Sequence, residues 1–130
     1  MSKLTPREKA SQRFAWLFFA AGCVLTVMLQ ATVGLYFTHH YFVAHFLLGL
    51  FLPFAFYGMG GMRLTFWIGM ELTALWHFGY EFWEDQLDRP VYTLDWDQII
   101  SGAFGLVAAW LTYRAWNRRF DRSAAADPNQ

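Results

Sequence analysis

Residues 14–37 read FAWLFFAAGCVLTVMLQATVGLYF, a run without a single Asp, Glu, Lys or Arg. A helix needs about 20 consecutive, mostly apolar residues to cross the hydrocarbon core of a bilayer. This stretch is therefore long enough to span a membrane as one helix. A basic segment precedes it and no A-x-A-type cleavage site closely follows it, so we expect a retained helix and not a removed signal peptide.

Three more apolar segments follow along the chain, at residues 41–57, 64–83 and 98–116. The glycine-rich turn Gly58–Gly61 separates the first two of them, and an acidic segment with Pro90 separates the last two. Hydrophobic residues make up 56% of the 130 residues and aromatic residues 21%, which is more than one small soluble core can bury. We therefore predict an all-α fold, an integral membrane four-helix bundle over residues 14–117.

The basic residues lie in three regions that four spans would place on one side of the membrane. Nine of the ten are Lys3, Arg7, Lys9, Arg13, Arg63, Arg114, Arg118, Arg119 and Arg122. Cytoplasmic flanks are enriched in lysine and arginine. This predicts an N-in/C-in protein of a bacterial inner membrane, with a basic, weakly structured segment at residues 1–13 and a partly disordered tail at residues 118–130. No basic patch of the kind that binds nucleic acid is visible.

Each predicted span carries small and polar residues on one face. Lipid is as apolar as leucine, so membrane helices associate through such residues. Their steps of three or four residues predict a tight bundle with a polar interior seam. The members are Gly22, Thr26, Gln30 and Gly34; then His45, Gly49 and Pro53; then Gly69, Thr73, His77, Glu81 and Glu84; and finally Asp97, Ser101, Gly105, Ala108 and Thr112. The single cysteine, Cys23, is expected to be a small buried hydrophobic residue.

Four ionisable residues of these faces are predicted to meet at one depth, toward the outer side of the membrane. They are His45, His77, Glu81 and Asp97. Ionisable groups inside a membrane are costly, so they point to a functional site. Gln30, Ser101 and Glu84 are expected to line the same pocket. Glu71 lies deeper and off the third stripe; if its face meets a neighbouring helix, Gln30 or Thr26 is its expected hydrogen-bond partner.

Three roles suit this cluster. In an enzyme, Glu81 would be the general acid or base, and His77 and His45 would position or share its proton. Asp97 would then orient a histidine. Alternatively, the two histidines and two carboxylates would bind a divalent metal ion such as Zn²⁺. In the third role, the same groups only hydrogen-bond one another and lock the bundle. His39 is expected to be a solvated loop residue, as is the adjacent histidine.

Three short motifs resemble a known family. They are His45-Phe-Leu-Leu-Gly49, Tyr80-Glu81-Phe-Trp-Glu84 and the segment from Asp95 through Asp97 to Gly105. Their order over residues 41–109 resembles the VanZ-like membrane proteins and the related YjdF-type inner-membrane family. The resemblance implies that His45, Glu81 and Asp97 are the family's polar positions, with Glu84 and Asp95 next. The loop at residues 85–94 is shorter than in the YjdF type, and Ser101-Gly102 stands where an asparagine is common in the VanZ type.

VanZ-like proteins are linked to resistance to the glycopeptide teicoplanin, and the resemblance bears on the fold and the site more than on a reaction. From the polar pocket at the outer face we expect a small multi-pass protein with a His/carboxylate pocket that binds or modifies an envelope or lipid-linked molecule. The alternative is a structural or accessory subunit of a larger membrane complex. The expected partners are membrane lipids, a lipid-linked or envelope small molecule, and a second copy or other membrane proteins.

Overall fold

The computed structural model describes residues 5–61, 63–87 and 94–125, and leaves the side chains of residues 84–86 and 119–125 out of that description. Every regular element in the described part of the chain is helical, which confirms the all-α prediction. Helix α1 (Pro6–Leu29) continues without a break into the π-helical segment η1 (Gln30–Thr38). Helices α2 (Phe42–Gly60), α3 (Arg63–Leu87) and α4 (Trp96–Ala125) complete the bundle.

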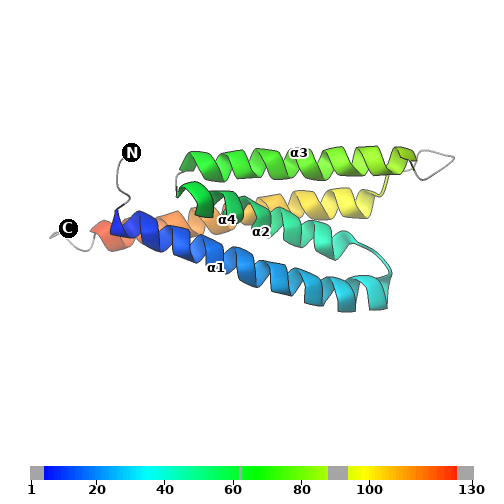
Figure 1. Cartoon of the computed structure of the whole chain (residues 1–130), viewed down its shortest axis with the longest axis horizontal. Coiled ribbons are helices and arrows are strands. Elements are labelled where there is room, and N and C mark those ends of the chain that lie inside the picture. Colours follow the sequence, from blue (N-terminus) through cyan, green and yellow to red (C-terminus); the bar gives the residue numbers. More distant parts are fainter. Residues whose placement is uncertain (1–4, 62, 88–93, 126–130) are drawn as a thin grey trace.

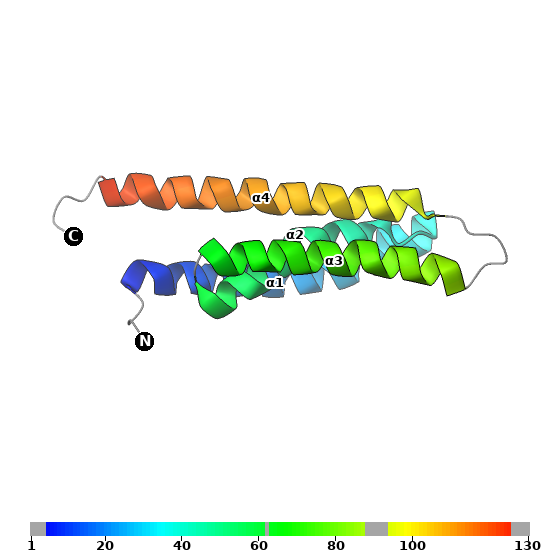
Figure 2. The same ribbon diagram turned by 90° about the horizontal axis from the view of Figure 1, so that it is seen from above.

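Helix α2 lies at the centre of the bundle and packs against α1, α3 and α4. Helices α1 and α3 lie on opposite sides of it, and in the described residues their backbones do not approach each other (Figure 1). Successive helices run in opposite directions, so α1 and α3 begin at the end of the bundle where α2 and α4 finish (Figures 1 and 2). We call this the basic end, because the three arginine- and lysine-bearing regions meet there, and the other the site end.

Two helix ends differ from the sequence prediction. Helix α1 begins at Pro6, inside the segment expected to be weakly structured, because Thr5 forms a capping box with Glu8. The Thr5 hydroxyl accepts a hydrogen bond from the Glu8 N–H at 3.3 Å, and the Thr5 N–H donates to the Glu8 carboxylate at 2.7 Å. Helix α4 runs to Ala125, so it includes the first part of the predicted tail. Residues 126–130 lie outside the described residues.

Two of the described helices are long and apolar enough to cross a membrane, namely the continuous α1–η1 segment (Pro6–Thr38) and α2. Only about 11% of the most apolar window of the first is buried, so apolar side chains such as Leu17, Val24 and Val27 face outward along its length. Helices α3 and α4 carry more ionisable residues, which lowers their overall hydropathy. Insertion of all four helices into a membrane therefore stays a prediction.

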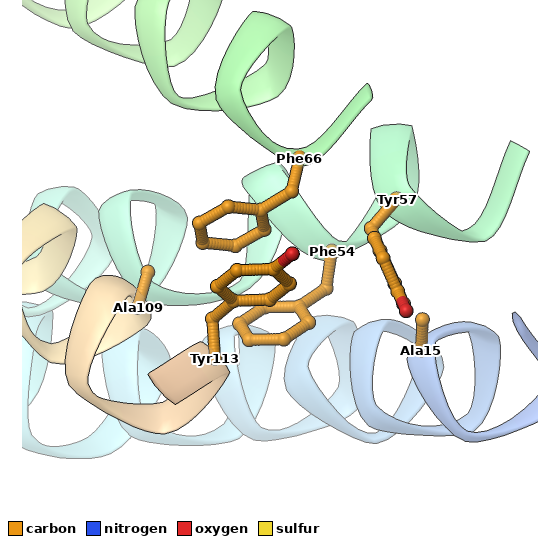
Figure 3. Close-up of a cluster of buried hydrophobic side chains, with 6 residues drawn as sticks. All are labelled: Ala15, Phe54, Tyr57, Phe66, Ala109 and Tyr113. Carbon is orange, nitrogen blue, oxygen red and sulfur yellow. The ribbon is translucent and has the colours of Figure 1, made fainter. Parts of the chain in front are cut away.

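A cluster of buried hydrophobic side chains lies in the half of the bundle next to the basic end. It comprises Ala15, Phe54, Tyr57, Phe66, Ala109 and Tyr113, which come from all four helices (Figure 3). The rings of Phe66 and Tyr113 stack with their centroids 3.9 Å apart and an angle of 8° between their planes. Aromatic packing thus fixes α3 against α4 in this half and leaves the polar residues to the site end.

Glycine allows α2 and α4 to cross with their backbones in contact. A Cβ atom at Gly49 would lie 2.6 Å from the Gly102 carbonyl oxygen, and one at Gly105 would collide with the Phe46 carbonyl oxygen. Both glycines belong to the predicted inward stripes and are buried. The buried face of α4 is nevertheless rotated from the prediction. It consists of Ile99, Gly102, Gly105, Leu106, Ala109 and Tyr113, whereas the predicted Asp97 is exposed.

Two single residues also lie elsewhere than predicted. Cys23 is exposed, because α1 buries only the face of Ser11, Ala15 and Gly22. Glu71 is exposed on α3, on the far side of α2 from α1. The expected hydrogen bond from Thr26 or Gln30 to Glu71 is therefore wrong, and the Thr26 hydroxyl donates to the Gly22 carbonyl oxygen instead.

Candidate functional site

His45, His77 and Glu81 meet in the site-end half of the bundle. The Nδ1 atom of His45 lies 3.1 Å from Nδ1 of His77 and 3.1 Å from Oε1 of Glu81. One ligand atom from each residue falls within 4.8 Å of the others. The side chain of Glu81 is 2% exposed and that of His45 is 14% exposed, so the cluster is largely shielded from its surroundings.

The local helical structure explains this convergence. His77 and Glu81 stand one turn apart on the buried face of α3, and Thr73 precedes them on the same face. The Thr73 hydroxyl donates its proton to the Gly69 carbonyl oxygen of its own helix at 2.6 Å, so it does not donate to a histidine. His45 lies in the first turn of α2, directly opposite. The centroids of the two imidazole rings are 5.1 Å apart.

Helix α4 closes the third side and fixes the His77 ring. The Nε2 atom of His77 lies 3.3 Å from the Ile99 carbonyl oxygen. A carbonyl oxygen only accepts, so this contact requires the proton of a neutral ring to be on Nε2. The Nδ1 atom of His77 then presents its lone pair to His45.

Gln98 supports the second histidine from the same helix. Its Nε2 atom donates to Asp95 Oδ2 at 3.1 Å, which leaves the amide oxygen of Gln98 as an acceptor. The Gln98 side chain also lies close to His45. If one ring nitrogen of His45 donates its proton to this amide oxygen, the other ring nitrogen carries a lone pair, as Nδ1 of His77 does. The α4 side chains and backbone are therefore suited to orient both histidines.

A small cavity of about 50 Å³ lies beside the two histidines, between α2 and α3. Its walls include Leu48, Trp76 and Tyr80, each of which is also exposed on the outside of the bundle. A volume of this size holds water or one chemical group, and not a whole ligand, which needs about 300 Å³ or more. The cavity is thus suited to admit one group of a molecule that lies along the outer surface of α2 and α3.

The structure does not bring Asp97 into this cluster. Its Oδ2 atom lies 3.1 Å from Nδ1 of His40, in the connection between η1 and α2, and both side chains are about half exposed. The sequence prediction treated His40 as a solvated loop residue. The contact is possible because the connection between η1 and α2 lies beside the first turn of α4.

Two of the three predicted lining residues, Gln30 and Ser101, lie around the site and not in it. Gln30 donates through Nε2 to the His40 carbonyl oxygen at 3.1 Å and accepts through Oε1 from the Ala44 N–H at 3.0 Å. The Ser101 hydroxyl donates to the Gln98 carbonyl oxygen at 2.9 Å. The side chain of Glu84 lies outside the described residues.

Three contributors to the site went unnoticed in the sequence. Gly102 forms the surface against which the His77 ring packs, Ile99 supplies a backbone acceptor, and Gln98 contacts His45. Gly102 and Gln98 stand beside the predicted stripe residues Ser101 and Asp97, so a small rotation of the α4 face would have included them. The acceptor from Ile99 is a backbone carbonyl, so the identity of the side chain gives no indication of it.

The fold and the site define a helical bundle with a buried His–His–Glu cluster. Comparisons of the chain with protein-family models, with curated proteins and with solved structures find no match. The resemblance to VanZ-like and YjdF-type proteins accordingly stays a prediction, and any function has to be argued from the cluster itself.

Proposed function

We propose that this chain is a multi-pass protein of a bacterial inner membrane, with both termini in the cytoplasm, that binds a divalent transition-metal ion of the Zn²⁺ type through His45, His77 and Glu81. The carrying observation is that His45 Nδ1 lies 3.1 Å from both of the other ligand atoms. Tetrahedral bonds of about 2.0–2.1 Å separate neighbouring ligand atoms by about 3.3 Å. Two of the three separations are thus close to the spacing that such an ion needs, and all three lie within 4.8 Å.

The surroundings of the histidines support a metal over a shared proton. Metal-bound histidines usually donate their second ring N–H to a carbonyl or carboxylate oxygen. Ile99 offers such an oxygen to His77, and Gln98 offers one to His45. At 3.1 Å the two Nδ1 atoms share one proton when no cation is present, and a bound cation would take the place of that proton.

Three protein ligands leave one tetrahedral position for water or substrate, as in catalytic zinc sites. The cavity beside the histidines leads toward the outer surface of α2 and α3 at Trp76 and Tyr80. In a membrane, that surface faces lipid. The molecule that this protein binds or modifies is accordingly an envelope or lipid-linked compound, with one polar group that enters the cavity. Bound metal would make such a group more reactive as a Lewis acid.

Metal content of the purified protein tests the proposal. After purification with added Zn²⁺ and removal of excess, native mass spectrometry should find one ion per chain in the wild type and in His40→Ala, which removes an exposed histidine outside the cluster. His45→Ala should lose the ion while it retains the helical content of the wild type. A wild-type protein without zinc, or a His45→Ala variant with undiminished zinc, would rule the site out.

A second candidate function is favoured by Glu71. Its carboxylate is exposed on α3 beside the exposed residues Ile68 and Leu75. A carboxylate that faces lipid is costly, so a partner protein that covers it would stabilise the membrane-inserted form. In this case the chain is an accessory subunit and its polar cluster only locks the bundle. Co-purification of a stoichiometric partner that Glu71→Leu abolishes would support this candidate, and a wild-type protein that purifies alone would exclude it.

A further inference from the structure

A second cleft lies at the opposite end of the bundle from the histidines. It has a volume of about 540 Å³ and is formed by the beginning of α3 and the last part of α4. Among the described residues, its lining includes three arginines, Arg63, Arg114 and Arg118, and no acidic residue. Two tryptophans, Trp67 and Trp110, complete its walls. The cleft therefore combines a strong positive charge with apolar, aromatic surface.

The three guanidinium groups are available to a ligand. Among the residues that the structure describes, no carboxylate forms a salt bridge with any of them. The guanidinium carbon of Arg114 lies 4.9 Å from the centre of the Trp110 ring, a cation–π contact that orients the group. The N–H groups of a guanidinium point outward in its own plane, and the Trp110 ring lies over the face of that plane. The donors of Arg114 therefore remain free for an oxyanion.

The wall of the cleft is rigid where it meets the core. Tyr113 lines the cleft and is 6% exposed, since its ring is stacked on Phe66. Asn117 adds an amide donor beside the arginines one turn further along α4. A planar guanidinium and an amide on a fixed helix suit the oxygens of a phosphate, which accepts paired hydrogen bonds from arginine.

The position of the cleft along the bundle indicates the source of that phosphate. Tryptophan is enriched at the level of lipid headgroups, and arginine pockets on the cytoplasmic side bind anionic headgroups. We propose that this cleft binds the headgroup phosphate of an acidic phospholipid of the phosphatidylglycerol class in the cytoplasmic leaflet. Its volume of about 540 Å³ fits one headgroup. The proposal shares only the membrane location with the proposed metal site and does not depend on the metal.

Lipid binding to the full-length protein in detergent tests the proposal. Short-chain phosphatidylglycerol, phosphatidylcholine and inorganic phosphate are each titrated and counted by native mass spectrometry. The wild type should bind one phosphatidylglycerol at least tenfold more tightly than phosphatidylcholine. Each arginine near a headgroup contributes roughly fivefold to affinity, so Arg114→Gln/Arg118→Gln should weaken binding about 25-fold.

The matched control is Lys9→Gln/Arg13→Gln. It removes the same charge from the same end of the molecule, at exposed positions of α1 outside the cleft. This control should change the affinity less than twofold. If the control pair loses as much affinity as the cleft pair, the attraction is diffuse and the proposal is wrong. It is equally wrong if phosphatidylcholine binds as tightly, or if millimolar inorganic phosphate displaces the lipid and so identifies a soluble anion as the occupant.

A folding defect is separated from a binding defect by melting temperatures measured without lipid. Both double variants should melt as the wild type does, because all four side chains are exposed. If the α4 pair melts early, Arg63→Gln on the opposite wall of the cleft replaces it, with an expected loss of about fivefold. An unchanged affinity in Arg63→Gln would then overturn the proposal.

Discussion

The imidazole ring of His77 lies directly against Gly102, and a methyl group at position 102 would overlap three atoms of that ring. The contact keeps the ring upright between α3 and α4, with Nε2 toward the Ile99 carbonyl oxygen and Nδ1 toward His45. A glycine on one helix thus sets the position of a ligand atom on another.

Gly102→Ala should therefore weaken metal binding without removing any ligand. The added methyl group displaces the His77 ring, and loss of such support typically lowers metal affinity about 10- to 100-fold. The measurement is a competitive Zn²⁺ titration of the purified protein. Gly79→Ala is the matched control, because a Cβ atom there meets nothing within 4 Å. Equal zinc affinity in the two variants would show that Gly102 does not position the ligand.

Glu81→Gln should make the stability of the protein insensitive to chelation. The substitution keeps the shape of the side chain and removes its charge, so the site retains two histidines and loses its anionic ligand. An ion that binds only the folded state stabilises that state. Chelator should lower the melting temperature of the zinc-loaded wild type and leave Glu81→Gln unchanged. A wild type that melts at the same temperature with and without chelator would contradict the metal site.

Gln30→Ala should destabilise the bundle by about 1–3 kcal/mol, because two hydrogen bonds are lost at once. Tyr41, the N-cap residue of α2, makes no side-chain capping bond, and the Gln30 amide serves the Ala44 N–H in its place. Chemical denaturation followed by circular dichroism measures the change. Thr32→Ala is the control, since Thr32 is exposed and its hydroxyl bonds only to the backbone of its own helix. The idea fails if both variants are equally stable.

His39→Gly should stabilise the protein by roughly 1 kcal/mol. His39 has a φ of 60° and is the only non-glycine residue of the described chain with a positive φ. The left-handed conformation costs about 1–2 kcal/mol for a residue with a side chain, and part of that gain is offset by the greater freedom of glycine in the unfolded chain. Thermal unfolding provides the measurement. His40→Gly, which loses the contact with Asp97, should instead be neutral or destabilised; the reverse order of the two variants would contradict the prediction.

The number of helices and their inward faces followed from apolar length and from the spacing of small residues. This worked for α2 and α3 because their stripes, from Gly49 to Pro53 and from Gly69 to Glu81, coincide with backbone contacts. The predicted inward face was less accurate for α4. We assigned Ser101 to that face because it can form hydrogen bonds, but the close approach of the His77 ring places Gly102 there instead. Sequence periodicity reports the polarity of a face and is insensitive to a rotation by one residue.

The sequence predicted that His45, His77, Glu81 and Asp97 converge; the first three do, whereas Asp97 contacts His40. The i, i+4 relation within α3 is local and could be predicted from helical geometry. The residues of α2 that face α4 depend on the length and the path of the connection between η1 and α2. That path is set by the π-helical turns and by the left-handed residue His39, which the residue pattern does not reveal.

The crossing of α2 and α4 at Gly49 and Gly105 has a consequence for biosynthesis. The helix that fills the centre of the bundle is made second, whereas the helix against which it packs most extensively is made last. Until α4 leaves the ribosome, His45, His77 and Glu81 are all present but lack the groups that orient them. The cluster is completed only when the final helix docks, so an interrupted chain would carry all three residues without the groups that orient them.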